Sequence, residues 1–336
     1  MIKSTVCYLT NPYQLIFKDE IIDDENIESG FILCETLVSI ISPGTEIAAY
    51  VGAQPLRPGN AYPRLVGYCN VARVIKVGPN VSSVSVGDRV LTGACHCSHF
   101  LILESNILAT VSDKIESRYA ACAYLFQIGY DAVIRSGLKQ GSSVVVLGLG
   151  VLGLGSVAMS SRLGANVYGI SDYLIPTEIA KKFGANEIFN RKKIEDLKML
   201  LGNRLADVVI STSNSWSDWD LALQIAGKGS FIGVIGFPGR DLSSPKNNPL
   251  DSQYFYDKQL KIQAVGHVID EDDKSLSLKY NMKDNLSFIL SEMERGYLNP
   301  ELLISNMFSW SKLENAYKNL IKRVDSPITF GLEWKN

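Results

Sequence analysis

The chain has 336 residues, of which 46% are hydrophobic and 20% charged, and its net charge is −2. These values are typical of an ordinary globular protein and exclude the basic surface of a nucleic-acid-binding protein. No apolar run approaches the roughly 18–20 residues that span a bilayer, and the N-terminus lacks a signal-peptide pattern. We therefore expect a cytoplasmic protein with neither a membrane nor a nucleic-acid partner. A chain of this length usually forms two domains.

Residues 1–115 have the pattern of a β-rich domain. Short apolar runs, such as Phe31–Cys34 and Ala72–Val77, are separated by turn residues at close spacing. Clear turns are Gly78-Pro79-Asn80 and Val86-Gly87-Asp88. The pattern predicts a small barrel or an irregular β domain.

From Ser117 onward, helical and strand-like runs alternate. Ser117 is expected to cap a helix that continues through Ala132 and ends near Gly137. The following runs predict the strands Ser143–Leu147, Asn166–Ile170, Ala206–Ile210 and Ser230–Gly236, and the helices Val151–Leu163, Pro176–Phe183 and Trp219–Ala226. This alternation indicates an α/β fold with a doubly wound parallel sheet. Two helices, Met282–Gly296 and Ser311–Arg323, and the strand Ile328–Leu332 are expected at the C-terminal end.

A glycine motif follows the first of these strands. It is a G-x-G-x-x-G sequence that also opens a helix, and it consists of Gly148, Leu149, Gly150, Val151, Leu152 and Gly153. The first glycine permits a tight turn, the second leaves room for a pyrophosphate, and the third allows close helix–strand packing. Free amides at the helix N-terminus then bind the phosphates. The motif predicts a dinucleotide site, and the alternative is a glycine-rich turn that binds nothing.

The next strand is expected to end at the residue that contacts the adenosine ribose. That residue is Ser171, and Asp172 follows it. A serine argues against strict use of NAD, whereas an aspartate argues against an easy 2′-phosphate site. Arg191 is a candidate to neutralise that phosphate, the alternative being a solvated surface charge. On balance the sequence favours NADP(H) over NAD. Thr212 and Gly236, at the ends of later strands, complete the predicted cofactor site.

From end to end the chain resembles the medium-chain dehydrogenase/reductase family. The resemblance is carried by Val38–Glu46, Gly67-Tyr68-Cys69, the turn Val86–Val90 and the later segments Ala206–Ile210 and Ile235–Gly239. It implies a GroES-like β-rich catalytic domain formed by residues 1–118 and 270–336, a Rossmann dinucleotide-binding domain at residues 119–269, and a cleft where they meet. It also implies a homodimer joined at a sheet edge, for which Phe231–Val234 and the segment near Ala264–Val268 are candidates.

The sequence departs from the zinc-containing members of this family at every catalytic metal ligand. Pro43, Tyr68 and Tyr124 stand where those members have their three ligands, and the four-cysteine structural lobe is absent. No C-x2-C pair occurs among the six cysteines. A second possible metal site is the Cys95-His96-Cys97-Ser98-His99 run, in which only Cys95, Cys97 and His99 would share one side of a strand. Packed thiols and imidazoles are the favoured interpretation, so no metal is expected.

Without zinc, other groups must handle the substrate proton. The resemblance assigns proton relay to Thr45, whereas Tyr68 and Tyr124 place phenols at the emptied metal positions. A phenol can donate a hydrogen bond to a developing alkoxide or enolate, although each tyrosine can equally be a pocket-filling aromatic. His267 is a lower-ranked candidate for proton transfer. Glu46 is expected to hold its own loop rather than to perform chemistry.

The combined features predict a zinc-independent, NAD(P)(H)-dependent oxidoreductase that interconverts an alcohol and a ketone or aldehyde on a small biosynthetic substrate. The loop with Ser42-Pro43-Gly44-Thr45-Glu46 and the Gly67-Tyr68 pair are similar to a zinc-less branch that includes the bacteriochlorophyllide hydroxyethyl dehydrogenases. One alternative is NADPH-dependent reduction of an activated C=C bond, as in enoyl and quinone reductases. The other is a catalytically inactive protein that binds a dinucleotide.

Overall fold

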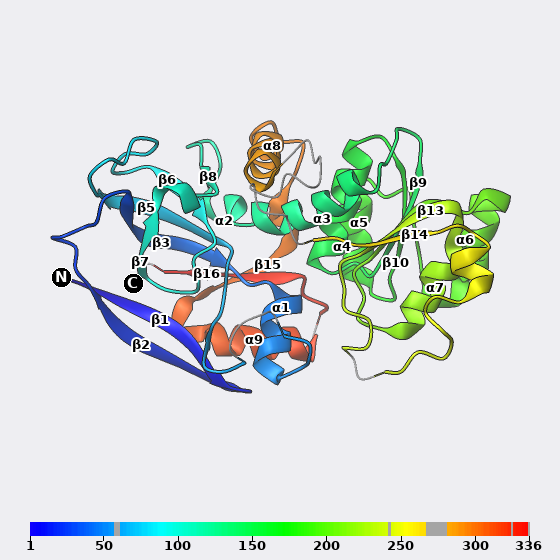
Figure 1. Ribbon diagram of the computed structural model, residues 1–336, viewed down its shortest axis with the longest axis horizontal. Coiled ribbons are helices and arrows are strands. Elements are labelled where there is room, and N and C mark those ends of the chain that lie inside the picture. The colour runs from blue at the N-terminus through cyan, green and yellow to red at the C-terminus, as the bar shows by residue number, and fades with distance from the viewer. Residues whose placement is uncertain (57–60, 241–242, 267–280, 324, 335–336) are drawn as a thin grey trace. The chain divides into compact units, whose positions relative to one another are not determined.

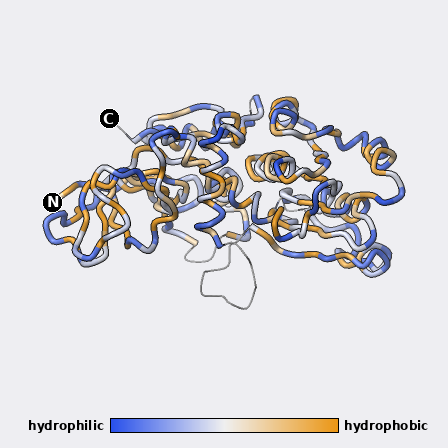
Figure 2. The backbone as a smooth tube through the Cα atoms, turned by 90° about the horizontal axis from the view of Figure 1, so that it is seen from above, coloured by the Kyte–Doolittle hydropathy of each residue, from blue (hydrophilic) through white to orange (hydrophobic). Residues whose placement is uncertain are grey.

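A computed structural model describes residues 1–56, 61–240, 243–266, 281–323 and 325–334. Its contacts divide the chain into two units, one formed by Met1–Tyr124 with Met282–Asn336 and the other by Leu125–Asn281. The predicted boundary at residues 269 and 270 falls outside the described residues, and the predicted domain limits stay a prediction. Hydrophobic and hydrophilic stretches alternate along the backbone (Figure 2), and no described helix is long and apolar enough to cross a membrane.

The first unit is built on two sheets (Figure 1). The smaller sheet has the order β2-β1-β4 and consists of β1 (Ile2–Asn11), β2 (Gln14–Ile22) and β4 (Arg64–Leu65). The larger sheet has the order β15-β16-β3-β5-β6-β8, with β7 also paired to β3; its strands are β3 (Phe31–Ile40), β5 (Asn70–Val77), β6 (Arg89–Thr92), β7 (His99–Leu103), β8 (Ala109–Thr110), β15 (Ile304–Ser309) and β16 (Thr329–Glu333). Because β16 pairs with β3, the two ends of the chain share one sheet.

Four α-helices complete the described part of this unit: α1 (Pro43–Val51), α2 (Ser117–Ala120), α8 (Met282–Glu294) and α9 (Leu313–Lys322). Helix α1 packs on α9, where the rings of Tyr50 and Tyr317 lie edge to face at 5.2 Å. The sequence predicted a loop at residues 42–46, but the structure starts α1 there. The reason is local: Pro43 occupies the first turn, where its fixed φ suits a helix and its missing N–H costs nothing.

The second unit contains a six-stranded sheet in which every pairing is parallel. Its order is β11-β10-β9-β12-β13-β14, and its strands are β9 (Ser143–Leu147), β10 (Asn166–Ile170), β11 (Glu187–Phe189), β12 (Ala206–Ser211), β13 (Ala226–Val234) and β14 (Lys261–Ala264). Numbered within the sheet, this is the 3-2-1-4-5-6 order of a Rossmann fold. The predicted doubly wound parallel sheet is confirmed.

The candidate dimer edge needs correction. The segment Phe231–Val234 belongs to β13, which pairs with β12 on one side and β14 on the other, so its backbone groups are already used. Among the residues that the structure describes, β14 (Lys261–Ala264) is the strand at this edge, because it follows β13 in the sheet. Residues 267 and 268 of the second candidate segment lie outside the described residues, and the homodimer stays a prediction.

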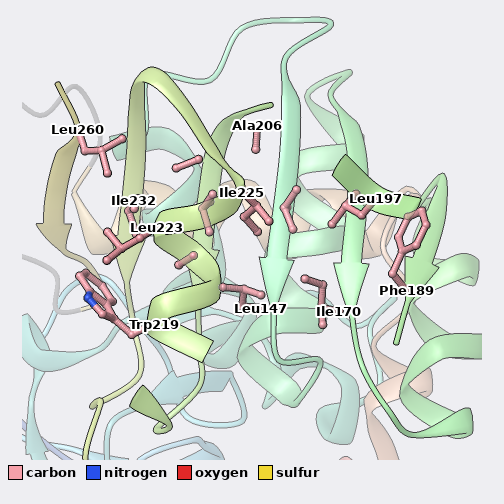
Figure 3. Packing of buried hydrophobic residues seen from close by; sticks show 14 residues of the cluster. Leu147, Ile170, Phe189, Leu197, Ala206, Trp219, Leu223, Ile225, Ile232 and Leu260 are labelled. Atoms are coloured by element: carbon pink, nitrogen blue, oxygen red, sulfur yellow. The ribbon is translucent and has the colours of Figure 1, made fainter. Parts of the chain in front are cut away.

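Helices cover both faces of this sheet (Figure 1). They are α3 (Ala123–Arg135), α4 (Val151–Arg162), α5 (Leu174–Lys182), α6 (Ile194–Leu201) and α7 (Trp216–Ile225). Figure 3 shows one face, where Leu147 and Ile170 from two strands pack with Leu197 of α6 and Trp219 of α7. This buried cluster fixes the strand ends that carry the glycine motif.

The helix predicted from Ser117 through residue 132 is in fact two helices, α2 and α3. Ser117 does not cap α2; Glu116 occupies the N-cap position, and the Ser117 hydroxyl accepts a hydrogen bond from Arg89 Nη1 at 3.1 Å. A tight turn separates the two helices, in which the backbone N–H of Cys122 donates a hydrogen bond to the carbonyl of Tyr119, three residues earlier. The Ser117 hydroxyl, which the local sequence predicts to cap the helix, thus accepts a hydrogen bond from Arg89, a residue distant in sequence. Helix α6 was not predicted.

Candidate functional site

The glycine motif forms the turn between β9 and α4. Gly148 has φ of +85°, a left-handed conformation that favours glycine. A Cβ on Gly153 would lie 1.9 Å from the carbonyl oxygen of Gly148, so the helix packs directly on the turn. A Cβ on Gly150 would meet nothing within 4 Å. The motif is therefore tightly packed at Gly153 and open at Gly150, the position where the sequence predicts that a phosphate group approaches.

The other three motif positions, Leu149, Val151 and Leu152, carry apolar side chains. Leu149 and Val151 are buried, and the side chain of Leu149 lies against Gly169 of β10. The carbonyl of Leu152 accepts a hydrogen bond from Ser156 within α4. These apolar side chains hold the turn against the sheet, and the amides at the start of α4 are the groups available to an anion.

Thr212 and Gly236 adjoin the same turn from neighbouring strands. The Thr212 hydroxyl donates to the carbonyl oxygens of Gly148 at 2.9 Å and Leu147 at 3.1 Å. A Cβ on Gly236 would lie 2.2 Å from the carbonyl oxygen of Ser213, so these two strand ends touch. Strands β9 and β12 are adjacent although β10 and β11 separate them in sequence, which makes this the topological switch point where such sheets bind ligands.

Two residues of the predicted adenosine site, Asp172 and Arg191, form an ionic cluster with Asp218 that the sequence did not reveal. Arg191 donates to Asp172 through its backbone amide at 3.0 Å and through Nη1 at 2.6 Å. Its Nε and Nη2 bind both carboxylate oxygens of Asp218, a buried residue of α7, at 2.7 Å each. The hydrogen bond to Asp218 raises the pKa of Arg191. Burial opposes the charge of Asp172, but hydrogen bonds from Arg191 lower its pKa overall.

Arg191 is thus not the solvated charge considered as an alternative. The hydroxyl of Ser171 is also committed locally, since it accepts a hydrogen bond from the amide of Tyr173. The donor set of this edge fits a dinucleotide: helix amides and Gly150 at the phosphates, and an acidic residue about 20 positions beyond the motif at the ribose. The chain can hold such a cofactor through residues 148–153, Ser171 and Asp172.

A second group of hydroxyls gathers at the start of α1 in the first unit. The hydroxyl of Tyr68 hydrogen-bonds the Ser42 hydroxyl and lies 3.4 Å from Oγ1 of Thr45. Thr45 and Ser42 are in the N-terminal turn of α1, and Tyr68 lies just before β5. The structure therefore brings together the hydroxyls of two of the four predicted catalytic residues, and it adds Ser42, which sequence reasoning missed.

Tyr124 joins this group through its ring. The rings of Tyr68 and Tyr124 are edge to face, with centroids 5.2 Å apart. This geometry is the favoured packing of two aromatic rings. The fourth candidate, His267, lies outside the described residues.

The residues at the family's metal positions do not fit zinc. Pro43 offers only ring carbons, the Tyr68 hydroxyl is hydrogen-bonded to hydroxyls, and Tyr124 packs on Tyr68. Zinc in proteins takes thiolate, imidazole or carboxylate ligands. Among the residues that the structure describes, no group of three His, Cys, Asp or Glu side chains could hold a metal.

The cysteine–histidine run has a different organisation from an extended strand. Residues 93–98 are mostly irregular, with one isolated bridge between Cys97 and Val6. A hydrogen bond between the thiols lowers the pKa of Cys95 and raises that of Cys97. His96 points elsewhere: its Nε2 lies 2.9 Å from Oε2 of Glu46. Glu46 also accepts the backbone N–H of Ser42, which confirms that it holds its own loop.

Comparisons with known proteins show what the chain is similar to. The family model described as zinc-binding dehydrogenase matches residues 151–271. An uncharacterised zinc-type alcohol dehydrogenase-like protein of Haemophilus influenzae is 26% identical over 282 residues, or 74% of this chain and 80% of the relative. Sorbitol dehydrogenase of Bacillus subtilis is 23% identical over 77% of this chain and 78% of its own length. The crystal structure of 2R,3R-butanediol dehydrogenase from Bacillus subtilis superposes with a TM-score of 0.82 at 17% identity, covering 99% of this chain and 100% of the other.

The chain is similar to alcohol and polyol dehydrogenases of the medium-chain dehydrogenase/reductase family over about three quarters of its length. It has the α/β architecture of that family, a GroES-like unit and a Rossmann unit, and it is an oxidoreductase. Dehydrogenases of this family use NAD(P). The family-model match begins at Val151 and therefore does not include Pro43, Tyr68 or Tyr124.

Proposed function

We propose that this enzyme interconverts an alcohol and a ketone or aldehyde with NAD(P)(H) and without zinc. The observation that carries the proposal is the cluster of three hydroxyls formed by Tyr68, Ser42 and Thr45. Tyr68 is the residue of this cluster that the family resemblance assigns to a metal position. Support for the reaction class comes from relatives that are alcohol and polyol dehydrogenases. The first unit supplies the proton-transfer groups, and the second binds the dinucleotide.

Bound nicotinamide supplies the hydride acceptor for alcohol oxidation and the hydride donor for carbonyl reduction. In the reducing direction the substrate carbonyl gains a hydride at carbon and a proton at oxygen. The Tyr68 hydroxyl, or the Thr45 hydroxyl beside it, donates a hydrogen bond to that oxygen as negative charge develops. Transfer of the same hydrogen completes the alcohol, and in the oxidising direction these groups take the proton back.

The cluster of three hydroxyls supports a reaction mechanism without a metal. A zinc ion would polarise the carbonyl as a Lewis acid, whereas two adjacent hydroxyls stabilise the same charge by hydrogen bonding. The bond between Ser42 and Tyr68 orients the phenol, and α1 holds Ser42 and Thr45 in a fixed helical turn. We therefore assign proton transfer to Tyr68 and Thr45, with Tyr124 packing on the Tyr68 ring.

For the cofactor we propose NAD(H) in place of the NADP(H) that the sequence favours. Arg191 is bound by Asp172 and Asp218, so the cluster carries more negative than positive charge. A 2′-phosphate at this edge would meet Asp172 and would have to compete with two carboxylates for the guanidinium. Ribose hydroxyls, by contrast, are good donors to the Asp172 carboxylate.

The test uses purified protein and the absorbance of reduced nicotinamide. A panel of secondary alcohols and polyols is offered with NAD⁺ or NADP⁺, and the corresponding ketones with NADH or NADPH, while metal content is measured on the same sample. We expect cofactor reduction by at least one alcohol, with zinc well below one equivalent and no loss on treatment with a chelator. Tyr68→Phe should lower kcat about 10²- to 10³-fold. Tyr8→Phe, which removes a hydroxyl bonded to Glu20 instead, should not.

Three outcomes would contradict the proposal. Oxidation of reduced cofactor only by enones would identify a C=C reductase. Binding of dinucleotide without turnover of any alcohol, carbonyl or enone would identify an inactive binding protein. Stoichiometric zinc that is lost together with activity would restore a metal mechanism. A bacteriochlorophyllide-type substrate, as in the branch that the sequence resembles, belongs in the panel as one candidate.

A further inference from the structure

Two ionisable side chains, Glu46 and His96, are buried together next to the cluster of hydroxyls formed by Tyr68, Ser42 and Thr45. Their exposed fractions are 2% and 1%, and His96 Nε2 lies 2.9 Å from Glu46 Oε2. Burial of a carboxylate and an imidazole is costly unless hydrogen bonds satisfy both groups. The described contacts of these two residues show what they hold in place.

The hydrogen bonds around His96 run in one direction. The indole of Trp334 can only donate, and its Nε1–H points to Ser39 Oγ at 2.8 Å. The Ser39 hydroxyl is then able to donate its own hydrogen to Nδ1 of His96, also at 2.8 Å. With Nδ1 as acceptor, the ring hydrogen is on Nε2 and is donated to Glu46. This arrangement gives every hydrogen of the chain Trp334–Ser39–His96–Glu46 an acceptor.

Glu46 connects this hydrogen-bonded chain to the N-terminal turn of α1. Its Oε2 accepts from His96 and, at 2.6 Å, from the hydroxyl of Tyr317. Its Oε1 accepts from the backbone N–H of Ser42 at 2.6 Å. The hydroxyl of Ser42 bonds Tyr68, and Thr45 is the residue next to Glu46. The carboxylate thus fixes the turn that carries both hydroxyl partners of the phenol.

His96 also contacts the backbone that leads into Tyr68. Its amide donates to the carbonyl of Val66 at 2.7 Å. Its ring covers Gly67, where a Cβ would lie 2.7 Å from the imidazole and where φ is +90°. Any side chain at position 67 would collide with the imidazole, so the ring needs glycine there. One imidazole therefore contacts both segments that meet at the phenol, residues 42–46 through Glu46 and residues 66–68 directly.

We propose that His96 is a positioning residue for the reaction: its hydrogen bond to Glu46 and its packing on Gly67 hold the Tyr68 hydroxyl in the geometry for proton transfer. The proposal rests on the proposed function. His96 acts through Glu46 and Tyr68 and does not itself exchange a proton with the substrate.

The test compares His96→Phe, which keeps a ring over Gly67 but removes both ring nitrogens, with His96→Gln, whose amide can still donate to Glu46. Thr36→Val is the matched control, because it removes a hydrogen bond between two other buried residues of this unit, Thr36 and Asn70. We expect His96→Phe to lower kcat about 10- to 100-fold with little change in dinucleotide affinity. His96→Gln should recover kcat to within about 5-fold of the original enzyme, and Thr36→Val should lower stability without lowering kcat.

A second readout does not depend on turnover. In protein labelled with ¹³C at the tyrosine ζ carbon, the Tyr68 signal is assigned by its loss in Tyr68→Phe. We expect His96→Phe to shift or broaden this signal, and His96→Gln and Thr36→Val to leave it in place. ¹⁵N-histidine spectra should show His96 with hydrogen on Nε2.

The outcomes separate the two proposals. An unchanged Tyr68 signal in His96→Phe overturns the positioning role whatever the activity, and so does a shifted signal with unchanged kcat. Equal loss of kcat in Thr36→Val would reduce the effect of His96 to stability alone, which also overturns it. An original enzyme that turns over no alcohol or carbonyl contradicts the proposed function, even when the ¹³C and ¹⁵N spectra show the expected hydrogen bonds.

Discussion

Arg191 and Asp218 form a bidentate ion pair in which Nε and Nη2 of the guanidinium each lie 2.7 Å from a different carboxylate oxygen. Asp218 is buried, whereas Arg191 is partly exposed and also bonds Asp172. Paired nitrogens and oxygens in this geometry make the strongest type of protein hydrogen bond. Asp218 therefore decides how much of the arginine's charge is available to a ligand.

Asp218→Asn should change both stability and cofactor preference. Because the amide accepts only one of the two hydrogen bonds, we expect unfolding to require about 1–3 kcal/mol less free energy. The less-neutralised Arg191 should strengthen NADPH binding relative to NADH several-fold. Chemical denaturation and fluorescence titration with each cofactor measure the two effects. Glu195→Gln, which removes the exposed partner of Lys198, is the control and should change neither. An unaltered ratio of NADH and NADPH affinities would refute the assigned role.

Two glycines of one motif should respond in opposite ways to a side chain. At Gly153 a Cβ would collide with the Gly148 carbonyl, so Gly153→Ala should cost about 1–3 kcal/mol of folding stability. At Gly150 there is open space, so Gly150→Val should fold with less than about 1 kcal/mol of loss. If a pyrophosphate approaches there, Gly150→Val should weaken dinucleotide binding at least about 10-fold. Denaturation and cofactor titration test both variants, and undiminished cofactor affinity in Gly150→Val would remove the basis for a phosphate site.

Cys95 should be the first cysteine to react with an alkylating reagent. The hydrogen bond from Cys97 lowers its pKa, and Cys95 is partly exposed, whereas the other five cysteines are buried. Burial raises the pKa of Cys34 to about 12 and also raises those of Cys7 and Cys122. Because the thiolate is the reactive form, iodoacetamide at neutral pH should modify Cys95 before the others. Peptide mass spectrometry identifies the site, and Cys97→Ala should slow the reaction. Simultaneous labelling of several cysteines would be inconsistent with this.

Stability should fall above about pH 10 because of two buried tyrosines. Burial, together with Glu46, raises the pKa of Tyr317, and burial with a hydrogen bond to Glu314 raises that of Tyr50 to about 12. The folded chain keeps these protons after the unfolded chain has released them near pH 10. The stabilisation is complete below that pH and is then lost by up to about 1.4 kcal/mol per pH unit for each residue.

Urea unfolding at pH 8, 10 and 11 measures this loss. Tyr317→Phe should be less stable at pH 8 by about 1–2 kcal/mol, because Glu46 loses a donor, but its stability should decline less steeply above pH 10. Tyr256→Phe, at an exposed position, serves as the control. Parallel pH dependences for Tyr317→Phe and the unsubstituted chain would show that another group is responsible.

Local pattern was enough to predict the glycine-rich turn and the sheet around it. A buried strand, a turn that needs Gly148 and a helix follow one another in a few residues, so each neighbour specifies the next. The strands Ser143–Leu147 and Asn166–Ile170 were predicted with the bounds found in the structure. Errors arose where a distant partner intervenes, as when Arg89 takes the Ser117 hydroxyl.

The polar clusters were out of reach for the same reason. His96 and Glu46 are 50 positions apart, and Arg191 and Asp218 are 27 apart. No spacing rule joins such pairs, because the fold alone brings them together. The sequence did indicate Tyr68 and Thr45, through the family resemblance, but it could not show that Ser42 bonds the phenol.

Arg191 lies two positions after β11, an edge strand of the six-stranded sheet that has three residues and, within the described part of the chain, pairs with β10 alone. Its ion pairs join it to Asp172 in the segment after β10 and to Asp218 in α7, the helix after β12. The arginine therefore links this edge of the sheet to more central elements. Any change of nucleotide preference made through Arg191 would therefore also change the rigidity of this sheet edge. A variant that frees the guanidinium to bind another coenzyme must replace the two ion pairs with other contacts. Otherwise β11 will be held less firmly on the sheet.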